Sequence, residues 1–121
     1  MAMADDMVEV IGLKTCDACR KAVAGLKAAG GTVQLRDLRD EPPTRDEAVH
    51  WISAVGPAVL NTRSTTWRSL DAEARTADPA DLIVAHPALV KRPLLRDAAG
   101  ALHLGWSDAT REALGLPRDL A

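Results

Sequence analysis

The residues best suited to chemistry are the two cysteines of the chain, Cys16 and Cys19, which are separated by two residues. They follow a short β-prone run, residues 8–11, closed by Gly12. This spacing places both sulfurs at the first turn of a predicted helix, where free backbone N–H groups and the positive end of the helix dipole favour a thiolate. Such a cysteine commonly has a lowered pKa and acts as a nucleophile, and the second cysteine can resolve a mixed disulfide.

A zinc site and inert packing are the two alternatives to redox chemistry for the cysteine pair. A structural zinc site normally takes four ligands, often as two separated pairs. Here there is one pair, and the three histidines are scattered as His50, His86 and His103. In the second alternative, both cysteines pack unreactively at the start of a helix. A Cys-x-x-Cys directly after a strand in a β-α-β context favours redox chemistry over both, and we expect no metal and no bound cofactor.

The elements that must position this pair predict an α/β fold. Apolar residues recur at helical spacing from residue 18 to residue 29, and residues 32–38 then alternate like a second strand. A helix between two strands implies a parallel pair with a right-handed crossover. Thr44, with Glu47 three residues later, is a capping box that opens a further helix. The expected order is β-α-β over 8–38, inserted helices at 44–54, 67–75 and 79–85, a β-β hairpin at 94–96 and 101–104, and a helix from 107 to 115.

Composition argues against several classes of function. The 121 residues are expected to form one domain, 1–121, frayed over 1–7. A net charge of −2 without a basic run, and three tryptophans as the only aromatic residues, do not suit a nucleic-acid binder. No apolar run approaches the length of a membrane span, and the acidic start does not look like a secretory signal. We therefore expect a cytoplasmic protein. In the reducing cytoplasm a cysteine pair rarely forms a structural disulfide.

Four segments of the sequence resemble one protein family. They are G-L-K-T-C-D-A-C-R-K-A at 12–22, N-T-R-S-T-T-W-R at 61–68, P-A-L-V-K-R-P-L-L at 87–95 and L-G-W-S-D at 104–108. In this order and at these separations they resemble the arsenate reductase-like family, the group that includes ArsC, Spx and YffB. The resemblance runs from about residue 8 to residue 114 and implies a thioredoxin-like core with a helical insertion. It also implies a cis peptide between Arg92 and Pro93.

The family resemblance implies that a cysteine thiolate reduces an oxidised substrate, with glutathione or a second cysteine as reductant and arginines holding an anionic group. Cys16 takes the place of the nucleophile and Cys19 that of the second cysteine. Glutathione is the implied co-substrate, and glutaredoxin or thioredoxin are possible partners. The residues implied to bind substrate or glutathione are Arg63, Arg92, Arg20 and Pro93. Without the resemblance, Arg63 could equally be a solvated loop cation and Arg92 a capping group.

Two departures from the family pattern bear on the substrate. Arsenate reductases of this type carry a histidine four residues before the nucleophile and an arginine near the last strand, where this chain has Gly12 and Gly105. We therefore expect arsenate to be a poor substrate. The chain also combines the Cys-x-x-Cys of the Spx branch with the loop motifs of the YffB branch. The alternative function is thus a redox-switched regulator that, like Spx, binds RNA polymerase.

Overall fold

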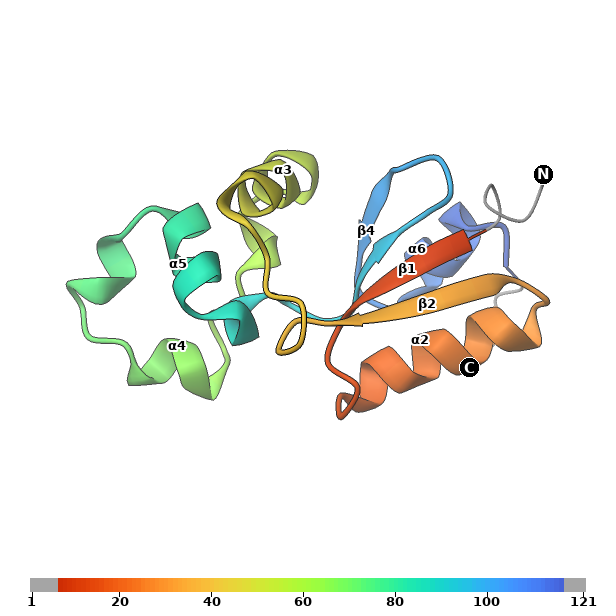
Figure 1. Ribbon diagram of the computed structural model, residues 1–121, viewed down its shortest axis with the longest axis horizontal. Coiled ribbons are helices and arrows are strands. Elements are labelled where there is room, and N and C mark those ends of the chain that lie inside the picture. Colours follow the sequence, from red (N-terminus) through yellow and green to blue (C-terminus); the bar gives the residue numbers. More distant parts are fainter. Residues whose placement is uncertain (1–6, 117–121) are drawn as a thin grey trace.

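The computed structural model describes residues 7–116, which form one four-stranded sheet with helices around it (Figure 1). The frayed start expected over 1–7 lies outside the described residues, apart from Met7, which begins β1. The elements in chain order are β1 (Met7–Gly12), α2 (Asp17–Ala28), β2 (Thr32–Asp37), α3 (Arg45–Val55), η1 (Pro57–Val59), α4 (Thr65–Ser69), η2 (Ala74–Thr76), α5 (Pro79–Ala85), η3 (Pro87–Leu89), β3 (Leu94–Arg96), β4 (Leu102–Leu104) and α6 (Asp108–Ala113).

The β1-α2-β2 unit forms as the sequence predicts. β1 and β2 pair in parallel along their whole length, from Met7 opposite Thr32 to Gly12 opposite Asp37. The helix between them is amphipathic, and its buried face carries Cys19, Ala22 and Leu26. α2 ends because Gly30 adopts a positive φ of 85°, a conformation that favours glycine, and its N–H bonds the carbonyl of Lys27.

The predicted hairpin supplies the other half of the sheet, whose strand order is β2-β1-β3-β4. β3 runs antiparallel to β1, and β4 antiparallel to β3. The turn between β3 and β4 is held by Asp97, whose carboxylate accepts hydrogen bonds from the N–H groups of Ala99 and Ala101, both at 2.9 Å. Gly100 completes the turn with a positive φ of 92°. The α/β class and the thioredoxin-like arrangement with a helical insertion are therefore confirmed.

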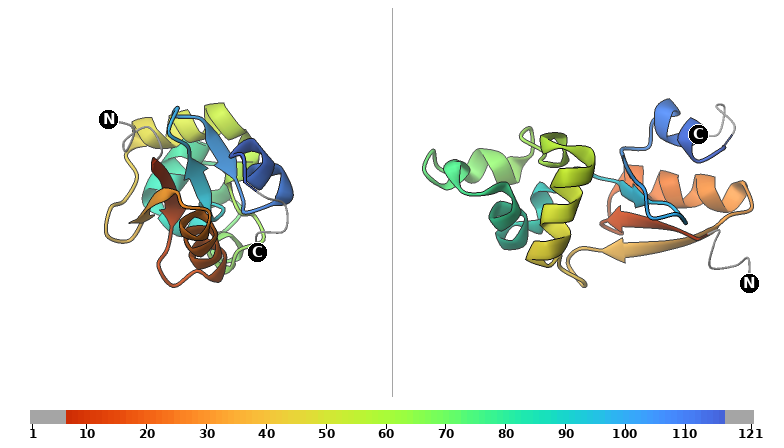
Figure 2. Two further views of the ribbon diagram at one scale, coloured as in Figure 1. Left: turned by 90° about the vertical axis from the view of Figure 1, so that its right-hand side faces the viewer. Right: turned by 90° about the horizontal axis from the view of Figure 1, so that it is seen from above.

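The helical insertion lies between β2 and β3 and forms the end of the molecule away from the hairpin turn (Figures 1 and 2). Its first helix starts with the predicted capping box: Thr44 accepts from the N–H of Glu47, and the Glu47 carboxylate accepts from the N–H of Thr44. The single helix predicted over 67–75 is wrong. α4 ends at Ser69, because Leu70 is extended and the Arg75 guanidinium donates to the last carbonyls of that helix, those of Trp67 and Arg68.

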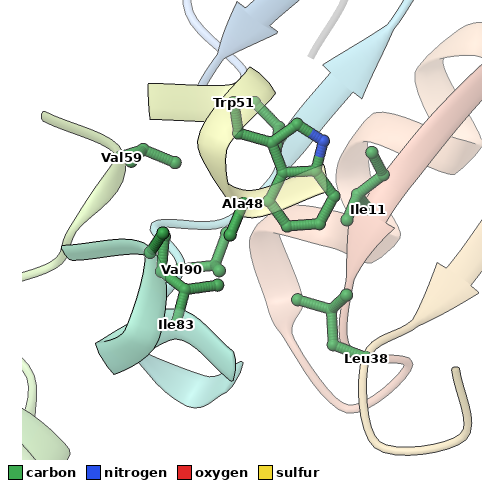
Figure 3. Close-up of a cluster of buried hydrophobic side chains, with 9 residues drawn as sticks. Ile11, Leu38, Ala48, Trp51, Val59, Ile83 and Val90 are labelled. Carbon is green, nitrogen blue, oxygen red and sulfur yellow. The ribbon is translucent and has the colours of Figure 1, made fainter. Parts of the chain in front are cut away.

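Two hydrophobic clusters hold these layers together. On one face of the sheet, Val10 and Leu95 pack against α2, and Trp106 lies against Gly25 of α2, where a Cβ would stand 2.7 Å from the indole ring. The second cluster joins the sheet to the insertion around the buried ring of Trp51 (Figure 3). Its members come from β1, α3, η1, α5 and β3 and from the residues that directly follow β2 and η3: Ile11, Leu38, Ala48, Trp51, Val59, Ala80, Ile83, Val90 and Leu94. The insertion thus shares a core with the sheet.

Candidate active site

Cys16 lies in the turn between β1 and α2, at the N-cap position of the helix, rather than within its first turn as the sequence spacing suggests. Its backbone is extended, with φ −82° and ψ 123°, and its carbonyl accepts from the N–H of Arg20. Its N–H bonds the carbonyl of Leu13 at 3.0 Å, which closes the turn. The side chain is half-buried, and an N-cap side chain faces the free N–H groups of the first helical turn. This position suits a reactive sulfur.

The environment of Cys16 favours its thiolate. Burial opposes ionisation, but it is outweighed by the backbone N–H and the thiol of Cys19, the backbone N–H of Ala18 and the positive charge of Arg92, so the pKa of Cys16 lies below its ordinary value. These are the interactions that activate cysteines at helix N-termini. Cys16 therefore loses its proton more readily than Cys19 does.

Cys19 lies three residues along the chain in an opposite environment. Its side chain is fully buried, with 0% exposure, against Val10, Ala22 and Leu26. Burial, together with the neighbouring Cys16 sulfur, raises the pKa of Cys19 to about 12. Cys19 is therefore a protonated thiol at neutral pH, and it must become a thiolate before it can attack a disulfide on Cys16. Both cysteines are free thiols in this structure.

Gly12 has a role that sequence reasoning did not detect. A Cβ built at this position would approach the Sγ atom of Cys19 to less than 3.0 Å, and it would stand 3.4 Å from Cγ of Arg92. The last residue of β1 must therefore lack a side chain so that the Cys19 sulfur and the Arg92 stem can meet above its backbone. The only signal in the sequence is a glycine at the strand end, four residues before Cys16 and seven before Cys19, and that pattern by itself indicates only a turn.

Asp37 is a second residue that the sequence did not predict. From the neighbouring strand it supports the turn between β1 and α2, residues 13–16, which we call the cysteine turn. Its buried carboxylate, 6% exposed, accepts hydrogen bonds from the N–H of Lys14 at 3.0 Å and from the N–H of Arg39 at 2.8 Å. Both bonds lower the pKa of Asp37, the bond from Lys14 more than the bond from Arg39, and together they bring it to about 2. Asp37 therefore ties the β1-α2 turn to the end of β2. Nothing in the sequence links these segments, which lie 23 residues apart.

The structure brings Arg92 to the cysteines, and Pro93 follows it at the start of the hairpin. The Arg92–Pro93 peptide is cis, as the family resemblance implied, and Pro93 is buried. Arg92 is half-buried, its stem packs over Gly12, and its charge acts on both sulfurs. A guanidinium in this position can hold an anionic group next to the reacting sulfur.

The other two predicted arginines occupy different places. Arg20 is exposed, and its guanidinium donates to the carbonyl of Lys14 at 3.0 Å. This hydrogen bond stabilises the cysteine turn on its solvent-exposed side. Arg63 is exposed in the loop before α4, where its N–H bonds the side chain of Asn61. Arg63 borders a separate hollow with Lys91, whose walls include neither cysteine nor any other residue of the turn before α2. Their predicted binding roles stay predictions.

A larger hollow, about 480 Å³, opens next to the cysteine turn. It lies between that turn, the connection after β2 and the start of η3, and its walls include Leu13, Leu38, Pro42, His86 and Pro87. Within residues 7–116 no group of three or more His, Cys, Asp or Glu side chains could hold a metal ion. None of the described helices is long and apolar enough to cross a bilayer.

The fold and the dithiol together define a class: thioredoxin-like proteins with a Cys-x-x-Cys motif at the start of the helix between two parallel strands, here α2. The chain belongs to the ArsC family, whose family model matches residues 11–114. It is 29% identical over 119 residues to the global transcriptional regulator Spx of Streptococcus mutans, an alignment that covers 93% of this chain and 85% of that protein. This family and fold support a thiol-dependent reductase or an Spx-like regulator.

Two solved structures agree with this assignment. A YffB protein superposes with a TM-score of 0.78 and 29% identity, over 94% of this chain and 99% of that one. An arsenate reductase (ArsC) related protein from Brucella melitensis superposes with a TM-score of 0.69 and 31% identity, over 88% of this chain and 92% of that one. The match over nearly the full length of both structures includes the helical insertion as well as the sheet.

Proposed function

We propose that this protein is a thiol-dependent, glutathione-linked reductase in which Cys16 is the nucleophile. The observation that carries the proposal is the difference between the two cysteines. Cys16 is partly exposed, lies at a helix N-cap beside Arg92 and has a lowered pKa, whereas Cys19 is buried with a pKa of about 12. An accessible attacking sulfur next to a buried resolving sulfur is the arrangement that stepwise disulfide exchange requires.

The proposed reaction proceeds by disulfide exchange. The Cys16 thiolate attacks one sulfur of a glutathione-containing mixed disulfide, the substrate S–S bond breaks, and the substrate leaves as a thiolate that takes a proton from water. Cys16 now carries glutathione in a new S–S bond. In one route, a second glutathione thiolate attacks the sulfur of the Cys16-bound glutathione, which releases oxidised glutathione and regenerates the Cys16 thiolate. In the other route, Cys19 loses its proton and attacks the Cys16 sulfur, which releases reduced glutathione and forms a Cys16–Cys19 disulfide that a further dithiol or two glutathiones must reduce. A reducing compartment such as the cytoplasm, with glutaredoxin or thioredoxin as further electron donors, would keep this cycle running.

Arg92 and Arg63 are proposed to bind the carboxylates of glutathione. Arg92→Ala is expected to weaken glutathione binding roughly tenfold, the effect of losing a partly desolvated charged hydrogen bond. Arg63→Ala is expected to have a smaller effect because its side chain is exposed. Titration calorimetry with glutathione measures both effects, and thermal unfolding checks that both variants remain folded. Unchanged affinity in two folded variants would contradict these roles.

The test of the proposed function is mass spectrometry of the reduced protein after exposure to oxidised glutathione. We expect a glutathione adduct on Cys16, which accumulates in Cys19→Ser and converts to an internal disulfide in the wild-type protein. Cys16→Ser should give neither product. If the wild-type protein stays unmodified under conditions that glutathionylate a small thiol, the proposal is wrong.

The second candidate function is a redox-switched regulator. It is favoured by the similarity to proteins named global transcriptional regulator Spx and by the Cys-x-x-Cys pair. In that case an internal disulfide would alter a binding surface for RNA polymerase without turnover. Capture of the purified polymerase α subunit by the oxidised and reduced forms of this chain distinguishes the two candidates. Redox-dependent capture without reductase turnover would favour the regulator.

A further inference from the structure

A second hollow, about 410 Å³, lies one residue away from Arg92 along the chain. We call it the basic hollow, and its walls are Ala58, Leu60, Asn61, Thr62, Arg63 and Lys91. Two of these six residues are cations, and two more carry polar amide or hydroxyl groups. This combination of charged donors and neutral donors is the lining that an anionic group requires.

The walls of the basic hollow are held in place by backbone pairing. Leu60 and Val90 form an isolated antiparallel bridge. On either side of it, the N–H of Asn61 bonds the carbonyl of Leu89 and the N–H of Lys91 bonds the carbonyl of Val59, both at 2.7 Å. Arg63 and Lys91 therefore extend from two segments that are fixed to each other, although their side chains are exposed.

The two stretches of chain that form the basic hollow carry net positive charge. Residues 48–70 and residues 82–96, which supply both walls, contain no Asp or Glu, although the chain has 17 acidic residues and a net charge of −2. The same stretches contain Arg63, Arg68, Lys91 and Arg92. The Arg68 guanidinium donates to the carbonyl of Arg63 at 2.8 Å, which brings a third cation to the edge of the hollow. No acidic side chain from these walls neutralises the charge.

We propose that the basic hollow is a carboxylate subsite, in which Lys91 together with Arg63 binds one carboxylate of the thiol or disulfide substrate. This inference rests on the proposed function and names the substrate class: a sulfur compound with an acidic arm that extends away from the reacting sulfur. Lys91 directly precedes Arg92, whose stem packs over Gly12 beside the Cys19 sulfur. Arg92 acts next to the reacting sulfurs, and Lys91 binds the far end of the same ligand.

The experiment compares two small disulfides as probes of the reduced protein. Oxidised glutathione carries carboxylates, and bis(2-hydroxyethyl) disulfide carries no charge. In each case the Cys16 thiolate attacks one sulfur, the probe's S–S bond breaks and one thiol leaves, so the released thiol gives the rate. The variants are Lys91→Ala, Lys91→Arg, and Lys27→Ala as a matched control. Lys27 is an exposed lysine in the last turn of α2, at the end of the helix away from the cysteines.

Lys91→Ala is expected to slow the reaction with oxidised glutathione roughly two- to fivefold, as for the loss of one exposed charge contact, and to leave the neutral probe unaffected. Lys91→Arg should restore the rate, Lys27→Ala should behave as wild type, and added salt should reduce the difference between wild type and Lys91→Ala. Equal slowing of both probes, or no slowing with oxidised glutathione, would overturn the carboxylate subsite. If wild-type protein reacts with neither probe, the proposed function itself fails.

Discussion

At the scale of single residues, the two cysteine sulfurs differ in acidity although they lie only three residues apart. The pKa of Cys16 is lowered and that of Cys19 is raised. Cys16 stands outside the helix as its N-cap and Cys19 stands inside as part of the core. An N-cap position offers free N–H groups to a sulfur, whereas a core position removes water from it. The chemistry of the pair therefore depends on where α2 begins.

The difference between the sulfurs predicts a difference in alkylation. At pH 7, Cys19→Ser, which retains Cys16, is expected to react with iodoacetamide more than about a hundredfold faster than Cys16→Ser, because each unit of pKa changes the thiolate fraction tenfold. As pH rises, the rate for Cys16 should level off at a lower pH than that for Cys19, which should still be rising at pH 10. Rates measured against pH test this, and faster reaction of Cys19 at neutral pH would reverse the assignment.

The contact between Gly12 and Cys19 predicts a conditional effect of substitution. Gly12→Ala should destabilise the wild-type protein by about 1–3 kcal/mol, because the new methyl group overlaps Sγ of Cys19 in a packed core. In a Cys19→Ala background, where that sulfur is absent, the same substitution should cost much less. Urea unfolding of all four proteins measures the coupling. Equal costs in both backgrounds would show that the overlap is relieved without Cys19.

At the scale of elements, the cysteine turn depends on hydrogen bonds that come from β2. Asp37 holds the N–H of Lys14, and one residue earlier Arg36 forms a two-point ion pair with Glu47 of α3, with Nη2 and Oε1 2.9 Å apart. The hydrogen bond from Arg36 is the main cause that lowers the pKa of Glu47 to about 2. The end of β2 thereby fixes the turn before α2 and the start of the insertion.

These carboxylates predict how stability depends on acid. The pKa values of Asp37 and Glu47 are about 2 in the folded protein, against roughly 4 in the unfolded chain. Their contribution to the free energy of unfolding is thus complete above pH 4–5 and is lost as the pH falls through 2. Asp37→Asn should flatten the fall in stability between pH 5 and pH 2. Urea unfolding across this range tests it, and parallel curves for wild type and variant would contradict it.

The sequence predicts the elements better than the contacts that assemble the site. The strands, the capping box at Thr44 and the hairpin could be predicted because short-range patterns determine them. The helix expected over 67–75 could not, because Arg75 ends α4 through bonds to carbonyls seven and eight residues earlier. Asp37 and Gly12 were missed for a similar reason. Their roles depend on the parallel register of β1 with β2 and on the packing of Arg92, which no local pattern contains.

At the scale of the whole molecule, the cysteine turn lies where the sheet meets the insertion. β1 contributes Gly12, β2 contributes Asp37, and the segment that returns from the insertion contributes Arg92. The cluster around Trp51 joins the same two parts of the molecule (Figure 3). The geometry of the proposed site is thus determined by the packing of the insertion on the sheet.

This architecture predicts poor reduction of arsenate. Arsenate is a compact anion whose reduction needs several donors around its oxygens, and losing one well-placed donor typically costs about 100- to 1000-fold in rate. Gly12 has no room for a side chain, and Gly105 has a positive φ of 86°, which disfavours any other residue. A side-by-side assay should show turnover of a glutathionylated thiol and little of arsenate. Robust arsenate reduction that is lost in Cys16→Ser would contradict this expectation.

The fit of Cys19 against Gly12 also has a consequence for how this protein can diverge. On this backbone, a side chain at position 12 is unfavourable while position 19 keeps its sulfur, whereas Cys19 can change while Gly12 is kept. A lineage that acquires a side chain at the end of β1 is therefore expected to lose the second cysteine first or at the same time. Aligned descendants of this chain that have a side chain at position 12 should therefore lack a cysteine at position 19, whereas those with glycine at position 12 can have either.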